Sequence, residues 1–133
     1  MTKQNTIASV VFDRQTPVMD REQIDMLLMV DEDGDDPTDL IRELIYLFET
    51  ESRAKFAELD RICMVDAVVD LRKVVHFVAG SAGNLGLVRL AAFYRAIEQT
   101  IDSGQLTDLS NAAQPIRDEF ESAIATFKAE FDL

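Results

Sequence analysis

The sequence predicts an all-α fold, an antiparallel up-down four-helix bundle with an extra short N-terminal helix. Apolar residues recur at spacings of three and four through four long segments, and no segment alternates apolar and polar residues as a strand does. Gly86 and Gly104 each follow one of these segments, at the place where helices commonly end. The connections are short, so neighbouring helices are expected to run in opposite directions. At 133 residues the chain fits one domain.

The N-terminal part divides into a loose lead-in, residues 1–18, and the start of the bundle, residues 19–133. The lead-in shows no clean period and contains Pro17. Asp20 and Gln23 have the spacing of a helix N-cap and its capping-box partner, which predicts a short helix that ends near Val30.

An acidic segment, residues 31–37, follows this short helix. Its alternating aspartates resemble a calcium-binding loop, but the sixth position is Asp36 where glycine is needed. The twelfth position is Arg42 where the calcium-binding glutamate would stand. We therefore predict a solvated turn, with Pro37 at the first position of the next helix.

The four long helices are predicted over residues 37–63, 66–85, 88–103 and 110–131. The first has its apolar stripe at Ile41, Leu44, Ile45, Phe48, Ser52, Phe56, Leu59 and Ile62. Pro115 lies within the last segment, so this helix is expected to begin nearer Ala113.

Composition narrows the classes of function. A net charge of −12 argues against binding to nucleic acid or to an anionic membrane surface. No apolar run approaches the roughly 20 residues that span a bilayer, and the N-terminus has no secretory apolar core. The lone Cys63 cannot form an internal disulfide. We expect a cytoplasmic protein.

His76 is the only histidine, and it is the strongest candidate for chemistry. At 100° per residue, its helix turns Leu71, Val74, Val78, Ala82 and Leu85 to the core and His76 to solvent. Val69, Arg72, Lys73, Ala79, Gly80 and Gly83 are expected on the same side as the imidazole. Each glycine costs a helix about 1 kcal/mol relative to alanine. A solvent-facing surface has no packing reason to accept this cost, so we interpret the glycines as room for an approaching macromolecule.

Other uses of a single histidine fit poorly. One histidine and one cysteine on separate helices are too few to bind zinc, so no metal site is predicted. No motif for a hydrolytic nucleophile is present, and the segment from Gly80 to Gly83 lacks the lysine and the preceding strand of a phosphate-binding loop. From the residues alone, the alternative that stays open is an exposed histidine without a role.

The segment that begins at His76 resembles the histidine-containing phosphotransfer (HPt) domain family. The family pattern is roughly His-x-hydrophobic-Lys-Gly-Ser-Ser/Ala-x-x-hydrophobic-Gly, and this chain reads His-Phe-Val-Ala-Gly-Ser-Ala-Gly-Asn-Leu-Gly. The histidine, both pattern glycines, the serine and both apolar positions match. The resemblance extends over about residues 18–131 and includes the Asp-Asp-Pro turn and the apolar run after it.

This resemblance implies that His76 accepts a phosphoryl group in a two-component phosphorelay, and that the chain has no kinase activity of its own. It implies that Glu98 hydrogen-bonds the imidazole ring and that a receiver domain docks around Val69, Gly83 and Asn84. The chain would need no cofactor, because the receiver supplies Mg²⁺. The departure is Ala79, which stands where the family usually has a lysine that assists the phosphoryl group. Arg72 and Lys73, one turn earlier, are candidates to replace this charge.

Two other functions stay open. The first is an HPt-like module that binds a receiver domain or a sensor kinase without being phosphorylated, which the missing lysine favours. The second is the dimerising histidine module of a sensor kinase, in which an acidic residue typically follows the histidine. Phe77 stands there in this chain, so the resemblance disfavours the second function, and we expect a monomer.

Overall fold

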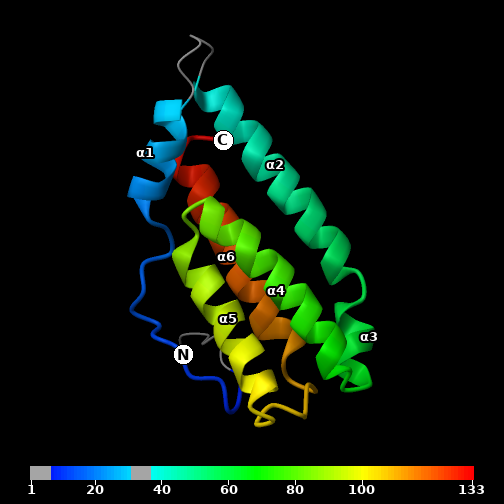
Figure 1. The fold of residues 1–133 in the computed structure, drawn as a ribbon. Helices are drawn as coiled ribbons and strands as arrows, with labels where there is room; N and C mark the ends of the chain where they lie inside the picture. The colour runs from blue at the N-terminus through cyan, green and yellow to red at the C-terminus, as the bar shows by residue number, and fades with distance from the viewer. Residues whose placement is uncertain (1–6, 31–36) are drawn as a thin grey trace.

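The computed structural model describes residues 7–30 and 37–133, and within these ranges all regular structure is helical (Figure 1). The helices are α1 (Arg21–Val30), α2 (Pro37–Phe56), α3 (Leu59–Met64), α4 (Val68–Asn84), α5 (Val88–Asp102) and α6 (Ala113–Glu130). The acidic turn predicted before Pro37 lies outside the described residues.

Four long helices, α2, α4, α5 and α6, run alternately up and down and enclose the core, as predicted from the sequence (Figure 1). The short helix α1 lies at one end of the bundle, and α3 lies at the other end, where it packs against α4 and α6. The largest fully buried side chains come from all parts of the chain: Ile24, Ile41, Leu59, Leu71, Leu87, Leu90, Phe93, Tyr94, Ile97, Leu109, Phe120 and Phe127.

The single helix predicted over residues 37–63 is wrong, because the chain turns at Ala57 and Glu58 and divides it into α2 and α3. The apolar spacing continues through the turn, so Leu59 and Ile62 are buried just as Phe56 is. The apolar spacing therefore predicted correctly which residues are buried. It could not predict that the chain changes direction between α2 and α3. In the next connection, between α3 and α4, Asp66 has a left-handed φ of 54°, and its carboxylate accepts a hydrogen bond from the Leu109 backbone at 2.7 Å.

The helix ends around Gly86 show why glycine is needed there. Gly86 has a φ of +72°, and a Cβ on it would lie 2.6 Å from the backbone oxygen of Asp20. The Asp20 carboxylate caps α1 by accepting a hydrogen bond from Glu22 N at 3.0 Å, while Asp20 N donates to Gly86 O at 2.7 Å. The backbone of Gly86 thus takes the place predicted for the Gln23 side chain in the capping box, and this bond anchors α1 to the end of α4.

The lead-in before α1 contains no helix or strand from residue 7 onward, and several of its apolar side chains, but not the exposed Val11, lie on the bundle. Ile7 is buried, and the Phe12 ring lies 4.7 Å from the ring of Phe93, centroid to centroid. The predicted shift in the start of the last helix is confirmed, since α6 begins at Ala113 and carries Pro115 in its first turn.

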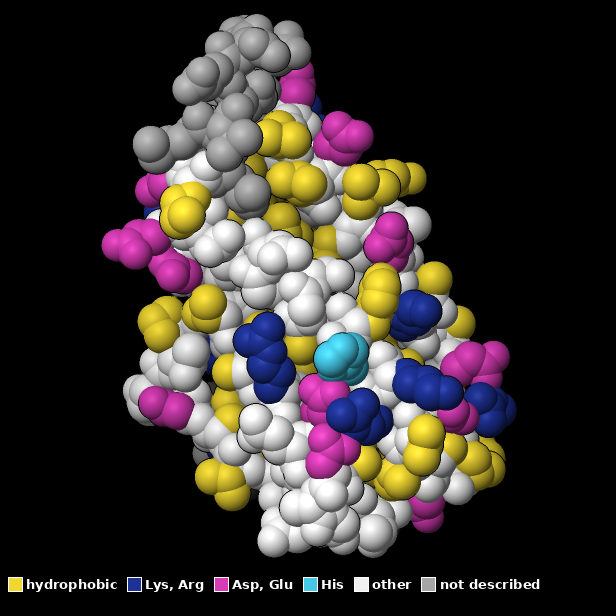
Figure 2. Space-filling view, viewed as in Figure 1, with side chains coloured by type: hydrophobic (Ala, Val, Ile, Leu, Met, Phe, Trp, Pro, Cys, Tyr) yellow, Lys and Arg dark blue, Asp and Glu magenta, His cyan; other side chains and the backbone are white. Residues whose placement is uncertain are grey.

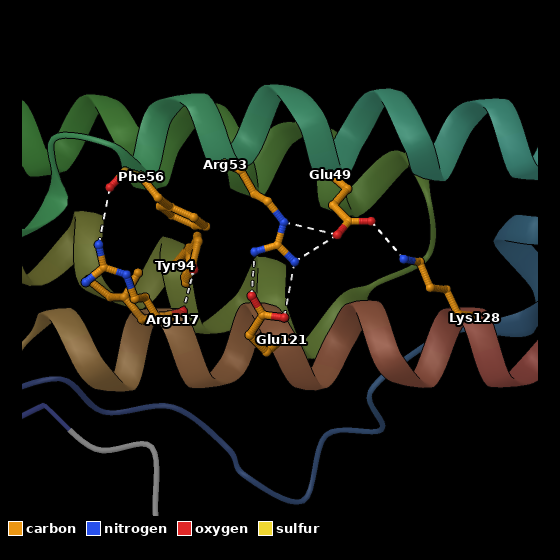
Figure 3. A network of polar contacts seen from close by, with 8 residues as sticks. Glu49, Arg53, Phe56, Tyr94, Arg117, Glu121 and Lys128 are labelled. Atoms are coloured by element: carbon orange, nitrogen blue, oxygen red, sulfur yellow. Dashed lines mark hydrogen bonds and ion pairs between the residues drawn. The ribbon is translucent and has the colours of Figure 1, made fainter. Parts of the chain in front are cut away.

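A row of charged side chains joins α2 to α6 along one side of the bundle (Figure 3). Arg53 donates to Glu49 at 2.8 Å and to Glu121 at 2.6 Å, and Lys128 lies 2.9 Å from Glu49. In the described part of the chain, no helix combines the length and the apolar character that a membrane crossing requires.

Candidate functional site

Helix α4 presents His76 to solvent because its opposite side is committed to the core. Leu71, Val74 and Val78 are buried, whereas the His76 side chain is 71% exposed. Figure 2 shows this histidine, in cyan, near the middle of one face of the molecule, with lysine and arginine side chains around it. The imidazole is therefore accessible to another macromolecule.

Glu98 on α5 holds the imidazole from one side. The Nδ1 atom of His76 lies 2.8 Å from Oε2 of Glu98, whose side chain is only 14% exposed. A carboxylate accepts a hydrogen bond from Nδ1–H, which selects the tautomer whose lone pair is on Nε2. The arrangement orients the ring and leaves Nε2 as a nucleophile that points to solvent. The geometry matches the role that the resemblance implies for Glu98.

Arg72 lies between two carboxylates of α5. Its Nη2 atom is 3.2 Å from Oε2 of Glu98, and its Nε atom is 2.6 Å from Oδ1 of Asp102. The hydrogen bond from Arg72 lowers the pKa of Asp102, and the same bond raises the pKa of Arg72. Arg72 is thus committed to orienting Glu98 and to pairing with Asp102, so it is not a free cation beside the imidazole.

Lys73 points to the other side of α4. It lines a shallow groove of about 310 Å³ between α2, α3 and α4, together with Lys55 and Arg61. The Lys55 ammonium lies 4.9 Å from the centre of the Phe77 ring, a cation–π contact next to His76. Lysine and arginine side chains therefore lie on both sides of the histidine, together with the carboxylates of Glu98 and Asp102, although the whole chain carries a net charge of −12.

The small residues that follow His76 on α4 differ in how exposed they are. Gly80 is exposed, and a Cβ on it would meet nothing within 4 Å. Gly83 is half-buried, and a Cβ on it would lie 3.5 Å from the Arg95 guanidinium. The placement of Ala79 on the exposed side is wrong, because Ala79 is 2% exposed and packs in the core. Helical angles alone put Ala79 at the edge of the histidine side, and the close approach of neighbouring helices covers it.

The predicted docking residues lie on the exposed side of α4, on both sides of His76. Val69 is 63% exposed near the start of the helix, and Asn84 is exposed at its end. Met64 and Val65, just before α4, add exposed apolar surface next to Val69. This surface combines apolar and basic side chains around one imidazole.

Sequence reasoning missed three contributors to this site: Asp102, which pairs with Arg72, Lys55, which covers Phe77, and Arg95, which lies over Gly83. Arg95 and Asp102 precede and follow Glu98 by three and four residues on α5, so helical spacing could have found them. Lys55 comes from a helix that is distant in the sequence, and only the fold brings it there.

Other chemistry has little support in the described ranges. They contain no group of three or more histidine, cysteine or acidic side chains placed to hold a metal ion. The Cys63 thiol is buried, and this burial raises its pKa. A thiol in that state is a poor nucleophile.

Comparison with protein families matches residues 43–130 to the Hpt domain. This span is most of the chain and includes His76, Glu98 and the helices that hold them. The chain belongs to the Hpt domain family. Hpt domains are phosphotransfer modules of two-component signalling, and they are carriers of a phosphoryl group and not kinases. The family predicted from the sequence is confirmed.

A solved structure supports the fold of this Hpt domain. The chain is similar to the crystal structure of histidine-containing phosphotransfer protein B (HptB) from Pseudomonas aeruginosa PAO1, with a TM-score of 0.70 and 23% sequence identity. The match covers 88% of this chain and 96% of HptB. A search of curated proteins finds no match.

Proposed function

We propose that this Hpt domain is a phosphorelay intermediate that carries a phosphoryl group on Nε2 of His76. It would receive the group from an aspartyl phosphate of a receiver domain, alone or within a hybrid sensor kinase, and pass it to another receiver. The observation that carries the proposal is the pairing of an exposed imidazole with a shielded carboxylate at 2.8 Å, which selects the tautomer of the neutral ring whose lone pair is on Nε2, the nitrogen directed away from Glu98.

The transfer step uses the two ring nitrogens differently. Nε2 attacks phosphorus and forms the P–N bond, while the P–O bond to the aspartate breaks and the carboxylate leaves with the electron pair. The proton stays on Nδ1, so the ring gains positive charge as the bond forms. Glu98 faces this charge, and a carboxylate already in position stabilises it without reorganisation. Reverse transfer uses the same contacts.

The surroundings of His76 suit an acidic partner surface. Receiver active sites are acidic and would hold the Mg²⁺ that offsets phosphoryl charge, so a basic surface on the Hpt domain is electrostatically complementary. Val69, Gly83 and Asn84 would lie in this interface, and exposed Gly80 would let the receiver approach the imidazole closely.

The experiment is phosphotransfer profiling with His76→Gln as the test variant. Receiver domains of the host are phosphorylated, mixed with the wild-type chain or the variant, and the acid-labile label on the chain is measured. The wild type is expected to acquire label from its cognate receiver within seconds to minutes, and the variant is expected to acquire none. Label on the variant equal to that on the wild type would refute the proposal.

Receiver binding without phosphorylation is the second candidate, and the burial of Ala79 favours it, because the usual lysine position supplies no charge here. This candidate predicts that the wild type binds a phosphorylated receiver and stays unlabelled. Measuring binding and label in the same mixture separates the two functions.

A further inference from the structure

The position that usually supplies a positive charge in the family cannot do so in this chain. Ala79 is 2% exposed and has no charge, while the next residue, Gly80, opens onto empty space. A phosphoryl group on Nε2 carries close to two negative charges near neutral pH. Some other cation must face this group if transfer is to be efficient.

Three nearby cations are engaged elsewhere or point away. Arg72 is held by Asp102 and Glu98, so moving it would release the carboxylate that orients the imidazole. Lys73 faces the groove beside α2 and α3, and Lys55 rests on the ring of Phe77. None of these side chains is both unengaged and directed to the open surface beyond His76.

Arg95 of α5 meets both conditions. Its guanidinium lies 3.5 Å from the position that a Cβ of Gly83 would occupy, on the exposed side of α4. The side chain is exposed, and within residues 7–30 and 37–133 no carboxylate forms an ion pair with it. Arg95 thus places an exposed positive charge over the backbone of α4 at Gly83.

The register of the two helices brings Arg95 within reach of the phosphoryl group. Glu98 lies opposite His76, and α4 and α5 are antiparallel, so Arg95, three residues before Glu98, lies level with Ala79 and Gly80. From this level, His76 lies about one helical turn (about 5.4 Å) in one direction and Gly83 about one turn in the other. The swing between them spans about 10.5 Å along α4, which an arginine side chain can cover by changing rotamers. Gly80 would place no side chain in this path, since a Cβ there has only open space around it.

We propose that Arg95 swings from Gly83 to His76 and binds the phosphoryl group on Nε2, replacing the charge that Ala79 lacks. The proposal rests on the proposed function, because it needs phosphorylation of His76. It assigns Gly80 and Gly83 a role within the molecule as well as toward a partner, since they form the track over which the guanidinium moves.

A small phosphodonor tests this without a receiver. Phosphoramidate would phosphorylate Nε2 directly, with ammonia as the leaving group. We expect Arg95→Gln to slow labelling about tenfold, the loss of one charge-assisted hydrogen bond, and Arg95→Lys to stay within about threefold of wild type. Arg42→Gln, which removes an exposed arginine paired with Asp39 on α2, is the matched control and should label at the wild-type rate.

Two further measurements separate phosphoryl binding from a structural role. Gly80→Lys in the Arg95→Gln background places a cation one turn after His76 and should restore most of the labelling rate. The side-chain NMR signals of Arg95 in the wild type should shift when His76 is phosphorylated and should not shift in His76→Gln treated with the same donor.

The outcomes distinguish this inference from the function on which it rests. No label on wild-type His76 from either donor would overturn the proposed function. Normal labelling of wild type together with an unchanged rate in Arg95→Gln, or with Arg95 signals that do not move, would overturn the role of Arg95 alone.

Discussion

Two networks of charged side chains join helices in this Hpt domain, and they differ in how completely their charges are balanced. Between α2 and α6, Arg53 and Lys128 face Glu49 and Glu121, two cations for two carboxylates (Figure 3). Between α4 and α5, Arg72 is the single arginine between Glu98 and Asp102, and the imidazole of His76 completes the group.

Under the proposed function, this difference in charge balance separates the network that takes part in phosphotransfer from the one that does not. The α2–α6 network is neutral as it stands, so it can only stabilise the fold. The α4–α5 network lacks one positive charge, and under the proposed function the imidazole ring would take on that charge when Nε2 binds phosphorus and Nδ1 keeps its proton. Ion pairs on a helix surface therefore do not by themselves indicate a functional site. A carboxylate without a matching cation, next to an accessible imidazole nitrogen, is the feature that points to one.

Removing the unbalanced carboxylate should have the largest effect. Glu98→Ala is expected to slow phosphorylation of His76 by about tenfold to a hundredfold, because the ring loses its orientation and the stabilisation of its positive charge. Glu98→Gln keeps an acceptor oxygen and should lose less. Labelling rates from phosphoramidate check both variants, and a Glu98→Ala rate equal to wild type would contradict the functional reading of the α4–α5 network.

Breaking the α2–α6 network should lower the free energy of unfolding and leave the phosphorylation rate of His76 unchanged. Arg53→Met removes two ion pairs and a cation–π contact with Phe120, and leaves Glu49 and Glu121 facing each other. We expect a loss of about 1 kcal/mol in the free energy of unfolding, since these side chains are partly exposed. Denaturant unfolding measures it, and the labelling rate of His76 should match wild type. A slowed rate would show that the two networks are coupled.

Removing the ion pair between Arg72 and Asp102 should slow phosphorylation of His76 less than removing Glu98 does. Asp102→Asn frees one side of the Arg72 guanidinium, and Glu98 still contacts both Arg72 and His76. We expect the labelling rate to fall about threefold or less, roughly 0.6 kcal/mol of barrier. A loss as large as that of Glu98→Ala would show that Asp102, not Glu98, sets the geometry of the imidazole.

The smallest predicted effect is on acid stability. Burial alone would raise the pKa of Glu49, but hydrogen bonds from Lys128 and Arg53 outweigh it and hold this pKa below its ordinary value of 4.5. A depressed carboxyl pKa stabilises the fold above the unfolded-state value and loses this contribution as pH falls through the folded-state value. Glu49→Gln should therefore flatten the acid limb of the stability curve by a few tenths of a kcal/mol. An acid limb identical to that of wild type would show that the network contributes nothing.

The sequence predicted the bundle, the four long segments and the family, because apolar spacing and glycine ends are local signals. It also placed His76 on the solvent side correctly, since most of the buried residues of α4 lie on the opposite face of the helix. The corner at Ala57 was missed because apolar spacing persists through it. Tertiary contacts, not local propensity, set the direction of α3.

Contacts between helices were harder to predict from the sequence than the buried and exposed faces of each single helix. The pairing of Glu98 with His76 followed from the resemblance, but the burial of Ala79 depends on how closely the neighbouring helices approach, which one helix cannot reveal. Arg72 lies one turn before His76 as expected. Its guanidinium, however, contacts the carboxylates of Glu98 and Asp102 and is not free to pair with a phosphoryl group. Side chains from neighbouring helices therefore decide which cations are free.

The most direct test of the account is to locate the phosphoryl group atom by atom. Wild-type protein labelled with ¹⁵N is phosphorylated by its cognate receiver, and the phosphorus–nitrogen couplings of His76 are measured by NMR. The account predicts phosphorus bonded to Nε2, with Nδ1 protonated and still hydrogen-bonded to Glu98. A phosphoryl group on Nδ1, or on any residue other than His76, would contradict it.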